Sequence, residues 1–310
     1  MSRYLVTGGA GFIGSNIVEE LVRRKAKVVV LDSLITGNLD NIKPFRKDID
    51  FIKGDIRDRK AIRRALKGVD YVIHQAALRS VPKSVDDPFT TNDINASGTL
   101  SVLFEAKAAG VKRLVYASTS SAYGDSRHFP QKETDLPKPI SPYGVSKLAG
   151  ENYCVTFART FGLETVSLRY FNVFGPRQNP ESKYSAVVPI FISNILNGKP
   201  PVIEWDGRQS RDFVYVDDVV SANLNACHTR GISGEVFNIG SGRATSVLDI
   251  LNGVNRILGE RKKAIFAPKR SGDVRKTYAD VSRMKRFLNM KKPVKFEDGL
   301  KRTIEWFKNK

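Results

Sequence analysis

The stretch RYLVTGGAGFIGSNIVEELVRRKAKVVVLDS, residues 3–33, decides the fold of this chain. A short apolar run opens it, and Gly8, Gly11 and Gly14 follow with the spacing G-x-x-G-x-x-G. The next segment places its apolar residues on one face of a helix, and a β-branched run then ends in Asp32. Strand, glycine turn, helix and strand ending in an acid together predict a dinucleotide-binding unit.

The alternation of strands and helices continues as far as residue 172. The predicted strands are DFIKGD, DYVIHQAA, KRLVYAS and TVSLRYFN, and the predicted helices are RKAIRRALKG, NASGTLSVLFEAKAAG and SPYGVSKLAGENYCVTFARTF. Strands that alternate with helices imply right-handed crossovers and a parallel sheet that helices cover on both faces.

Beyond residue 172 the pattern is less regular, with the polar loop VFGPRQNPESKYS and shorter apolar runs. The run EVFNIG could return to the main sheet as a buried strand. We therefore expect an α/β protein with two interleaved parts. These are a doubly wound parallel-sheet (Rossmann) domain of residues 1–172 and roughly 212–241, and a smaller mixed α/β lobe of roughly residues 173–211 and 242–310.

Length and composition narrow the class of protein. The chain has 310 residues, which is enough for a sizeable core. No apolar run reaches the ~18 residues that cross a bilayer, and no signal segment opens the sequence. We expect a soluble, cytoplasmic protein without a membrane partner. The two cysteines and three histidines are scattered, so we expect neither a disulfide framework nor a metal site.

The net charge of +19 is unusual, and it is concentrated near the end of the chain. Residues 261–310 hold 17 Lys and Arg against five Asp and Glu, which accounts for +12. Such a segment could bind a polyanion. A solvated lysine-rich surface is the favoured interpretation, because spaced apolar residues indicate that the segment folds. No nucleic-acid-binding motif accompanies the charge, so we expect no specific nucleic-acid partner.

The glycine turn and the acids that follow it suit NAD. Glycines let a pyrophosphate approach the backbone N–H groups at a helix N-terminus. Asp32 lies 18 residues beyond Gly14, where a carboxylate can accept from the adenosine ribose and would repel a 2′-phosphate. This favours NAD over NADP. Asp55 and Ile56 end the third predicted strand, where an adenine edge could be read.

A tyrosine and a lysine provide the second strong signal. In ISPYGVSKLAG, Ser141 suits an N-cap, and Tyr143 and Lys147 are one turn apart on one helical face. A free tyrosine, with a pKa of about 10, is a poor base. A nearby lysine, a nicotinamide cation and a helix N-terminus would all lower that pKa. Because the hydroxyl-tipped strand YASTSSAYG (residues 116–124) precedes the pair, we predict that the pair is catalytic.

The motifs TGGAGFIG, LDS, GDI, HQAA, ASTSSAYG, SPYGVSK, RYFNVFGP, RQSRDFVYVDDV and RSGDVRKTYAD together resemble the extended short-chain dehydrogenase/reductases. More narrowly, the chain resembles nucleotide-sugar epimerases of the UDP-galactose 4-epimerase type, in order and over almost its whole length. The resemblance implies that NAD stays bound and is regenerated in each turnover. Tyr143 would remove the proton of the sugar C4 hydroxyl while the C4 hydride passes to NAD⁺. The 4-keto sugar would then turn over and receive the hydride on its other face.

The resemblance also implies roles for individual residues. Thr119 would hydrogen-bond the C4 oxygen, and Lys147 would hold the nicotinamide ribose and lower the pKa of Tyr143. Asn95 would brace the site, and Ser118 would lie nearer the cofactor. The positions that match cofactor contacts are Gly8, Gly11, Phe12, Ile13, Gly14, Asp32, Gly37, Asn38, Asp55, Ile56, Gln75, Ala76, Ala77, Arg79, Asn95, Ser118, Tyr143, Lys147 and Tyr170.

The second lobe would hold the UDP-sugar. The matching positions are Ser80, Thr119, Tyr143, Asn172, Val188, Arg211, Arg270, Asp273 and Thr277. Arginines can grip a diphosphate bidentately, and an acid suits a ribose diol. Related enzymes form homodimers by packing two helices of each subunit into a four-helix bundle. We therefore expect a homodimer formed by the helices near residues 94–110 and 142–161.

The residues after Thr119 indicate the reaction. Related 4,6-dehydratases and decarboxylases carry an acid there, whereas this chain has Ser120 and Ser121. This favours plain C4 epimerisation of UDP-glucose and UDP-galactose. The motif ALRSVPKS and the small Thr277 at a gate position predict that UDP-GlcNAc and UDP-GalNAc are accepted as well. UDP-glucuronate 4-epimerase is the alternative, and a 4,6-dehydratase or decarboxylase is less favoured. Intact Thr119, Tyr143 and Lys147 argue against a catalytically silent NAD-binding regulator.

Overall fold

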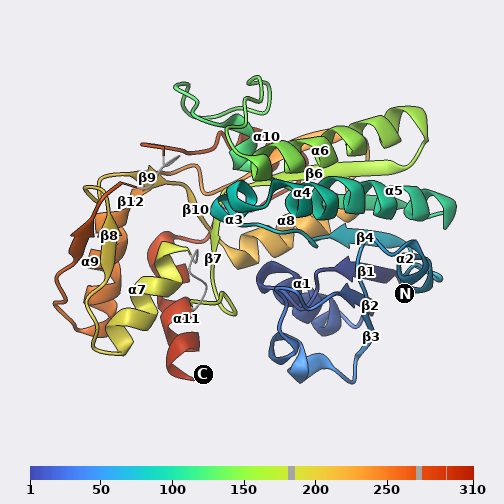
Figure 1. Ribbon diagram of the computed structural model, residues 1–310. Helices are drawn as coiled ribbons and strands as arrows, with labels where there is room; N and C mark the ends of the chain where they lie inside the picture. The colour runs from blue at the N-terminus through green and yellow to red at the C-terminus, as the bar shows by residue number, and fades with distance from the viewer. Residues whose placement is uncertain (181–185, 270–273, 291) are drawn as a thin grey trace.

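A seven-stranded parallel sheet forms the centre of the protein (Figure 1). The computed structural model describes residues 1–180, 186–269, 274–290 and 292–310. The strand order is β11-β6-β5-β4-β1-β2-β3, and every neighbouring pair is parallel. The strands are β1 (Arg3–Thr7), β2 (Lys27–Asp32), β3 (Ile49–Lys53), β4 (Tyr71–His74), β5 (Arg113–Thr119), β6 (Glu164–Tyr170) and β11 (Glu235–Ile239). The predicted doubly wound sheet is confirmed.

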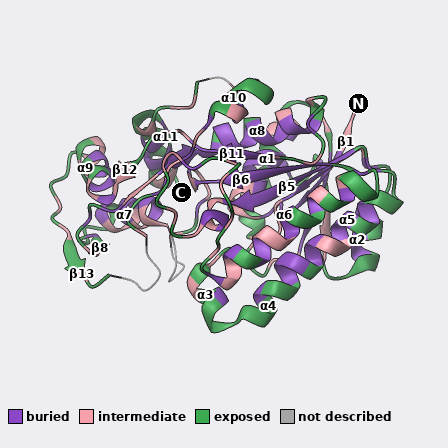
Figure 2. Ribbon diagram, turned by 90° about the horizontal axis from the view of Figure 1, so that it is seen from above, coloured by how far each residue is buried: buried purple, intermediate pink, exposed green. Residues whose placement is uncertain are grey.

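Helices cover both faces of this sheet and create two separate cores. The helices of the first face are α1 (Phe12–Arg23) and α8 (Val216–His228), and those of the second are α2 (Arg59–Ala65), α5 (Gly98–Ala108) and α6 (Pro142–Thr160). The short helices α3 (Val81–Asp86) and α4 (Pro88–Asn92) and a π-helical turn (Asp93–Ser97) lead into α5. Figure 2 shows the buried strands between helices whose outer faces are exposed.

The strand order reverses between β1 and β4. From β1 the chain adds β2 and β3 toward one edge of the sheet, and from β4 it adds β5, β6 and β11 toward the other. In open α/β sheets, ligands bind in the crevice at the carboxyl ends of the strands at this switch point. The glycine turn follows β1, and the segment beginning at Gln75 follows β4, so both border the crevice. The fold therefore places the site at this edge.

A smaller group of elements lies apart from the sheet, at the left of Figure 1. It contains α7 (Val187–Leu196), β8 (Val202–Glu204), β9 (Ser210–Arg211), β12 (Thr245–Ser246), α9 (Val247–Leu258), β13 (Ile265–Ala267) and α11 (Phe296–Lys308). The described structure is completed by β7 (Asn172–Phe174), β10 (Phe213–Tyr215), α10 (Ser282–Phe287) and three short 3₁₀ helices, η1 (Leu39–Asn41), η2 (Lys43–Phe45) and η4 (Ser120–Tyr123). β11 pairs with β6, so the expected return of EVFNIG to the main sheet is confirmed. The residue boundaries between the two lobes stay a prediction.

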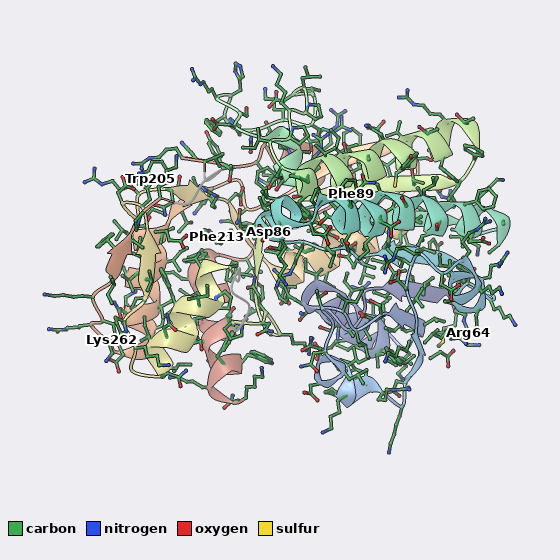
Figure 3. All side chains as sticks on the ribbon, viewed as in Figure 1. Arg64, Asp86, Phe89, Trp205, Phe213 and Lys262 are labelled. Carbon is green, nitrogen blue, oxygen red and sulfur yellow. The ribbon has the colours of Figure 1, made fainter. Side chains whose placement is uncertain are left out.

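Charged residues lie on both groups of elements. In Figure 3, Arg64 and Lys262 lie at opposite ends of the molecule, and Phe213 lies between the two groups of elements. Within the described residues, no helix is both long and apolar enough to cross a membrane.

Candidate active site

The glycine turn packs so closely that side chains would not fit. Gly8 has a φ of 68°, and a Cβ on it would lie 2.7 Å from the backbone nitrogen of Ala76. A Cβ on Gly14 would collide with the carbonyl oxygen of Gly8. Gly11 stands at the N-cap of α1 and has no side chain that could cap the N–H groups of the first turn. This turn of Phe12, Ile13 and Gly14 therefore fits a pyrophosphate.

Asp32 lies beside this turn and is almost completely buried. One carboxylate oxygen accepts from the backbone N–H of Ala10 (2.9 Å) and the other from that of Leu34 (2.8 Å). Burial raises the pKa of Asp32, and these two hydrogen bonds oppose the rise. A carboxylate has about four acceptor sites, so two remain for ribose hydroxyls. A Cβ on Gly37 would lie 2.6 Å from the Asp32 carboxylate, so glycine keeps this approach open.

The loop after β2 closes over the glycine turn. The carbonyl oxygen of Ala10 accepts from the backbone N–H of Asn38 (3.0 Å) and from the side chain of Asn41 (2.9 Å). Gly37 and Asn38, both predicted to contact the cofactor, are thereby brought next to the first turn of α1. Asn41 was not predicted, since no motif distinguishes it from other polar loop residues.

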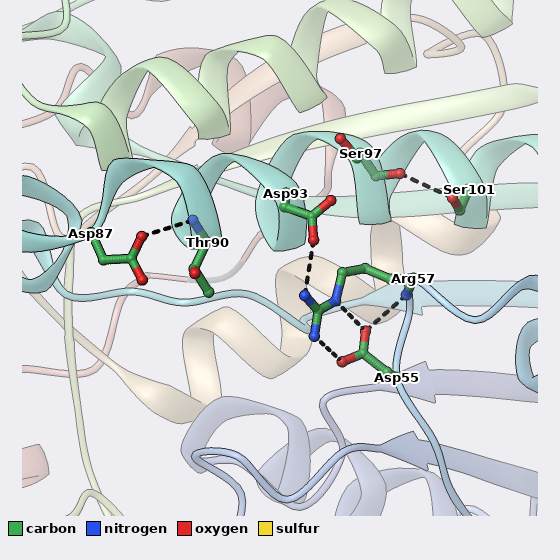
Figure 4. A network of polar contacts seen from close by, with 7 residues as sticks. All are labelled: Asp55, Arg57, Asp87, Thr90, Asp93, Ser97 and Ser101. Carbon is green, nitrogen blue, oxygen red and sulfur yellow. Dashed lines mark hydrogen bonds and ion pairs between the residues drawn. The ribbon is translucent and has the colours of Figure 1, made fainter.

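Asp55 is engaged by an arginine (Figure 4). Arg57 pairs with Asp55 (2.7 Å) and also with Asp93 (2.8 Å), so it joins the end of β3 to the π-helical turn. The side-chain hydrogen bond from Arg57 lowers the pKa of Asp55. Ile56 is buried, and a Cβ on Gly98 would lie 2.7 Å from its Cδ1. The predicted adenine contact of Asp55 and Ile56 stays a prediction.

The end of β4 carries Gln75, Ala76 and Ala77 to the crevice. The side-chain amide of Gln75 donates to the hydroxyl of Tyr170 (2.9 Å) and to Asn223 (3.1 Å). The structure therefore brings together two predicted cofactor residues from β4 and β6. Ala76 N–H donates to the Thr7 hydroxyl (3.3 Å).

His74, the last residue of β4, has a structural role. It is fully buried between the hydroxyls of Thr7 (2.6 Å) and Thr99 (3.0 Å). Burial lowers the pKa of His74 to about 3, so it stays neutral. As an uncharged side chain, it therefore connects its own strand, β4, to β1 and α5 through hydrogen bonds.

Asn95 ties the loop after β4 to the helix that carries Tyr143. Its side-chain oxygen accepts from Leu78 N–H (2.8 Å), and its amide donates to the Leu78 carbonyl (2.9 Å) and the Ser146 hydroxyl (3.0 Å). Asn95 is fully buried in the π-helical turn. Leu78 precedes Arg79, and Ser146 precedes Lys147, so Asn95 links the segments that carry these two predicted cofactor residues.

Thr119 ends β5, and Tyr143 lies in the first turn of α6, which packs against β5. Burial raises the pKa of Tyr143, whereas a hydrogen bond with the Thr119 side chain and the charge of Arg79 lower it. Tyr143 N–H donates to the Ser84 hydroxyl (3.1 Å) on α3, which helps to anchor the start of α6. Ser80, a predicted substrate residue, caps α3 by accepting from Lys83 N–H (3.3 Å).

Lys147 is buried one turn after Tyr143. Its Nζ lies 4.2 Å from the centre of the Tyr116 ring. Burial lowers the pKa of Lys147 to about 7, and the charges of Cys154 and Glu151 oppose the fall. The cation that lowers the pKa of Tyr143 in this structure is Arg79. The predicted effect of Lys147 on Tyr143 stays a prediction.

The hydroxyl of Ser118 is directed into the protein. It donates to the carboxylate of Glu151 (2.6 Å), which also binds Arg169 through two hydrogen bonds (3.0 and 2.6 Å). Glu151 was not singled out from the sequence. Its position eight residues after Tyr143 and four after Lys147, on the same helical face, was the available signal.

Three predicted substrate residues converge beside the second lobe. Asn172 N–H donates to the carbonyl of Asp212 (2.9 Å), while Thr277 N–H (3.1 Å) and the Arg211 side chain (2.8 Å) both donate to the carbonyl of Ser210. Arg211 thus lies in the segment of residues 210–212, and Asn172 and Thr277 lie beside this segment. The Val188 side chain is fully buried in the core, so only its backbone could meet a ligand. Arg270 and Asp273 lie outside the described residues.

Comparison with known proteins agrees with this geometry. Residues 4–240 match the NAD dependent epimerase/dehydratase family. The chain belongs to this family. It is also 36% identical over 318 residues to a UDP-glucose 4-epimerase from Mycolicibacterium smegmatis, covering 99% of each chain.

Two solved epimerases have nearly the same fold. A Thermotoga maritima UDP-glucose 4-epimerase, determined with UDP-glucose, matches with a TM-score of 0.94, 41% identity and 99% coverage of both chains. A Thermus thermophilus UDP-glucose 4-epimerase, determined with NAD, matches with a TM-score of 0.91 and 36% identity over 99% of each chain.

NAD is the cofactor of this family, and the donor set of the crevice fits it. The glycine turn offers backbone N–H groups to a pyrophosphate, and Asp32 offers acceptors to a ribose. Across the described ranges, no group of three His, Cys, Asp or Glu side chains is placed to hold a metal.

Proposed function

We propose that this enzyme epimerises a UDP-hexose at C4, interconverting UDP-glucose and UDP-galactose without net oxidation or reduction. The observation that carries the proposal is that the carboxyl end of β5, which ends in Thr119, lies against α6, whose first turn carries Tyr143, beside the NAD crevice. Lys147 follows one turn later on the same helix. A hydroxyl, a phenol and a lysine at this edge form the set that oxidation and reduction of a sugar hydroxyl requires.

Each side chain has a defined task in this mechanism. Thr119 hydrogen-bonds the C4 oxygen, and Tyr143 takes its proton and later returns it. NAD, when bound, supplies the hydride acceptor and donor. Lys147 donates to the nicotinamide ribose and adds positive charge near Tyr143. Because the same hydride returns to C4, the cofactor is unchanged after each turnover.

The nucleotide part of the substrate would lie against the second lobe. Arg211 and Asn172 adjoin one another through Ser210 and Asp212, and the resemblance adds Arg270 and Asp273. A guanidinium is suited to bidentate binding of a diphosphate. Support also comes from the related Thermotoga enzyme, which was determined with UDP-glucose.

The small Thr277 suggests that N-acetylated substrates are accepted. Its side chain is almost completely buried, and its hydroxyl has no hydrogen-bond partner among the described residues. A UDP-N-acetylglucosamine 4-epimerase from Methanobrevibacter ruminantium is 38% identical with a TM-score of 0.95. We expect Thr277→Tyr to weaken turnover of UDP-GlcNAc selectively. Equal loss on UDP-glucose would contradict this role for Thr277.

UDP-glucuronate is the alternative substrate. A UDP-glucuronate 4-epimerase from Thermodesulfobacterium geofontis is 34% identical over 319 residues. A dehydratase or decarboxylase is less favoured, because Ser120 and Ser121 occupy the positions after Thr119 where those enzymes carry an acid.

Product analysis tests the proposal. The purified protein would be incubated separately with UDP-glucose, UDP-GlcNAc and UDP-glucuronate, and the products separated by chromatography. The C4 epimer of UDP-glucose is the expected product. A 4-keto-6-deoxy sugar or a UDP-pentose as the main product would contradict the proposal.

We also propose a cytoplasmic homodimer built from α5 and α6 of each subunit. Phe104 on α5 is 50% exposed and Val145 on α6 is 52% exposed, so each helix presents an apolar side chain that a partner could cover. The two helices pack against one another, so their exposed faces could combine in one interface.

A further inference from the structure

Glu151 is a buried carboxylate that the mechanism above does not use. It lies on α6, and its exposed fraction is only 3%. Carboxylates are seldom buried in this way unless hydrogen bonds and an opposite charge compensate them. The hydrogen bonds of this carboxylate therefore indicate its role.

These contacts join α6, which carries Tyr143 and Lys147, to β5, which carries Thr119, and to β6. The Ser118 hydroxyl donates to Glu151 (2.6 Å), and Ser118 precedes Thr119 on β5. Arg169 on β6 donates twice to Glu151 (3.0 and 2.6 Å), and Arg169 precedes Tyr170, which binds Gln75. Glu151 itself follows Lys147 by one helical turn. One carboxylate thus connects α6, β5 and β6.

The network continues behind the strand end. The Arg169 guanidinium lies 4.7 Å from the centre of the Tyr123 ring, and the Tyr123 hydroxyl donates to Asn238 on β11 (2.6 Å). Stability alone does not explain such a network, because apolar residues of similar volume often stabilise a core as well as a buried ion pair does. A functional reason is therefore the better explanation.

Lys147 is the functional group that Glu151 can influence. Burial lowers the pKa of Lys147, while Cys154 and Glu151 raise it. Cys154 acts in this way only as a thiolate, and burial raises its own pKa to about 12, so at neutral pH it is an uncharged thiol. Glu151 is then the remaining group that raises the pKa of Lys147.

The other groups that face Lys147 cannot supply a negative charge. His74 on β4 is neutral, because burial lowers its pKa to about 3. Tyr116 on β5 is also neutral, because burial raises its pKa well above the ordinary value. Arg169 on β6 is a cation and would oppose an ammonium. Of the two groups that raise the pKa of Lys147, Glu151 is therefore the one that we expect to act.

We propose that Glu151 is a positioning residue that holds the Thr119 end of β5 against α6 and acts electrostatically on Lys147, which lies one turn earlier on the same helix. Its link to epimerisation rests on the function proposed above. Its effect on Lys147 does not, because Lys147 is expected to hold the cofactor ribose whichever sugar is the substrate.

The affinity for NAD, measured by calorimetry across pH, tests the charge. In Glu151→Gln, the loss of affinity on the alkaline side should move to lower pH by about one unit, as expected when a near charge is removed. The matched control is Glu164→Gln. Glu164 pairs with Arg113 (2.5 Å) between the same two strands at their opposite ends, so its pH profile should match that of the wild type. An unshifted profile in Glu151→Gln would overturn the proposal.

Two further variants separate charge from folding. Glu151→Gln leaves Arg169 as an uncompensated buried cation, so the double variant Glu151→Gln, Arg169→Gln removes both charges. If the single variant does not fold, as judged by circular dichroism, the double variant should still show a downward shift, smaller than the shift expected for the single variant because removing Arg169 also removes a charge that opposes the ammonium. An unshifted profile there would overturn the proposal. Ser118→Ala keeps the charge, so its pH profile should stay unchanged while kcat for UDP-glucose falls with little change in KM.

The test of epimerisation and the test of NAD affinity across pH can give opposite results. A wild-type protein that binds NAD but epimerises no UDP-sugar would overturn the proposed function. The shift in NAD affinity would still support the role of Glu151.

Discussion

At the scale of single residues, Tyr143 is in a difficult environment for a base. Burial raises its pKa, and among the described residues Thr119 and Arg79 oppose the rise. Proton removal at neutral pH therefore requires further positive charge near the phenol. Lys147 one turn away, and the cofactor when bound, are suited to provide it.

Replacing Tyr143 with phenylalanine should abolish proton transfer and leave the fold intact. We expect turnover of UDP-glucose to fall by at least ~100-fold, the usual contribution of a general acid–base residue. Tyr153 lies on the same helix and is 36% exposed, so Tyr153→Phe is the matched control. Equal turnover in Tyr143→Phe and the wild type would exclude Tyr143 as the base.

Lys147 should make stability depend on pH. Its pKa is about 7 in the folded protein against an ordinary value of 10.5, so the unfolded chain binds more protons between these values. Stability therefore rises with pH in this window. Lys147→Met removes the titrating group, and its advantage over the wild type in denaturant unfolding should be largest below about pH 7 and shrink toward about pH 10. A difference that is independent of pH would contradict the shifted pKa.

At the scale of elements, the glycine turn is fixed by contacts between backbone atoms. A Cβ on Gly14 would strike the carbonyl oxygen of Gly8, which cannot move without displacing β1. We expect Gly14→Ala to lower the free energy of unfolding by more than ~2 kcal/mol and to abolish NAD binding, both measurable by denaturant titration and calorimetry.

A second helical glycine provides the control for this substitution. A Cβ on Gly253 in α9 would meet only a methyl group of Leu300, at 3.0 Å. Gly253→Ala should therefore be close to neutral, since alanine favours a helix. Similar destabilisation by both substitutions would show that the close backbone approach at Gly14 is not the cause.

The elements that were predicted are those with strong local patterns. The glycine turn, the buried strands and the helix that starts at Ser141 have motifs or periodicities several residues long. The helices α3 and α4 were not predicted, because each has only five or six residues and begins near a proline. Strands of two or three residues in the second lobe, such as β9 and β12, carry no periodicity at all.

The site was predicted in part for the same reason. Tyr143, Lys147 and Thr119 lie in local motifs, whereas the partners of Glu151 lie on two other strands. No local pattern reports that Ser118 and Arg169 meet one carboxylate, because the sheet brings them together. The charge of Arg79 near Tyr143 likewise depends on how the segment after β4 folds.

At the scale of the whole molecule, the proposed dimer can be tested at an exposed aromatic. Phe104→Glu should convert the dimer into a monomer in light scattering, because the interface would have to bury a charge. Phe266 on β13 is 59% exposed, and β13 lies on the opposite side of the molecule from α5 in Figure 2, so Phe266→Glu should leave the dimer intact. Wild-type protein that elutes as a monomer would contradict the proposal.

The central claim is that the hydrogen on the sugar C4 leaves as a hydride and returns to the same carbon. This requires the cofactor on one lobe and the sugar nucleotide on the other. UDP-glucose labelled with deuterium at C4 would be converted by the enzyme in ordinary water, and the product examined by NMR. The account predicts UDP-galactose that retains deuterium at C4, because the hydride that leaves returns to the same carbon. UDP-galactose with hydrogen at C4, or no UDP-galactose at all, would contradict it.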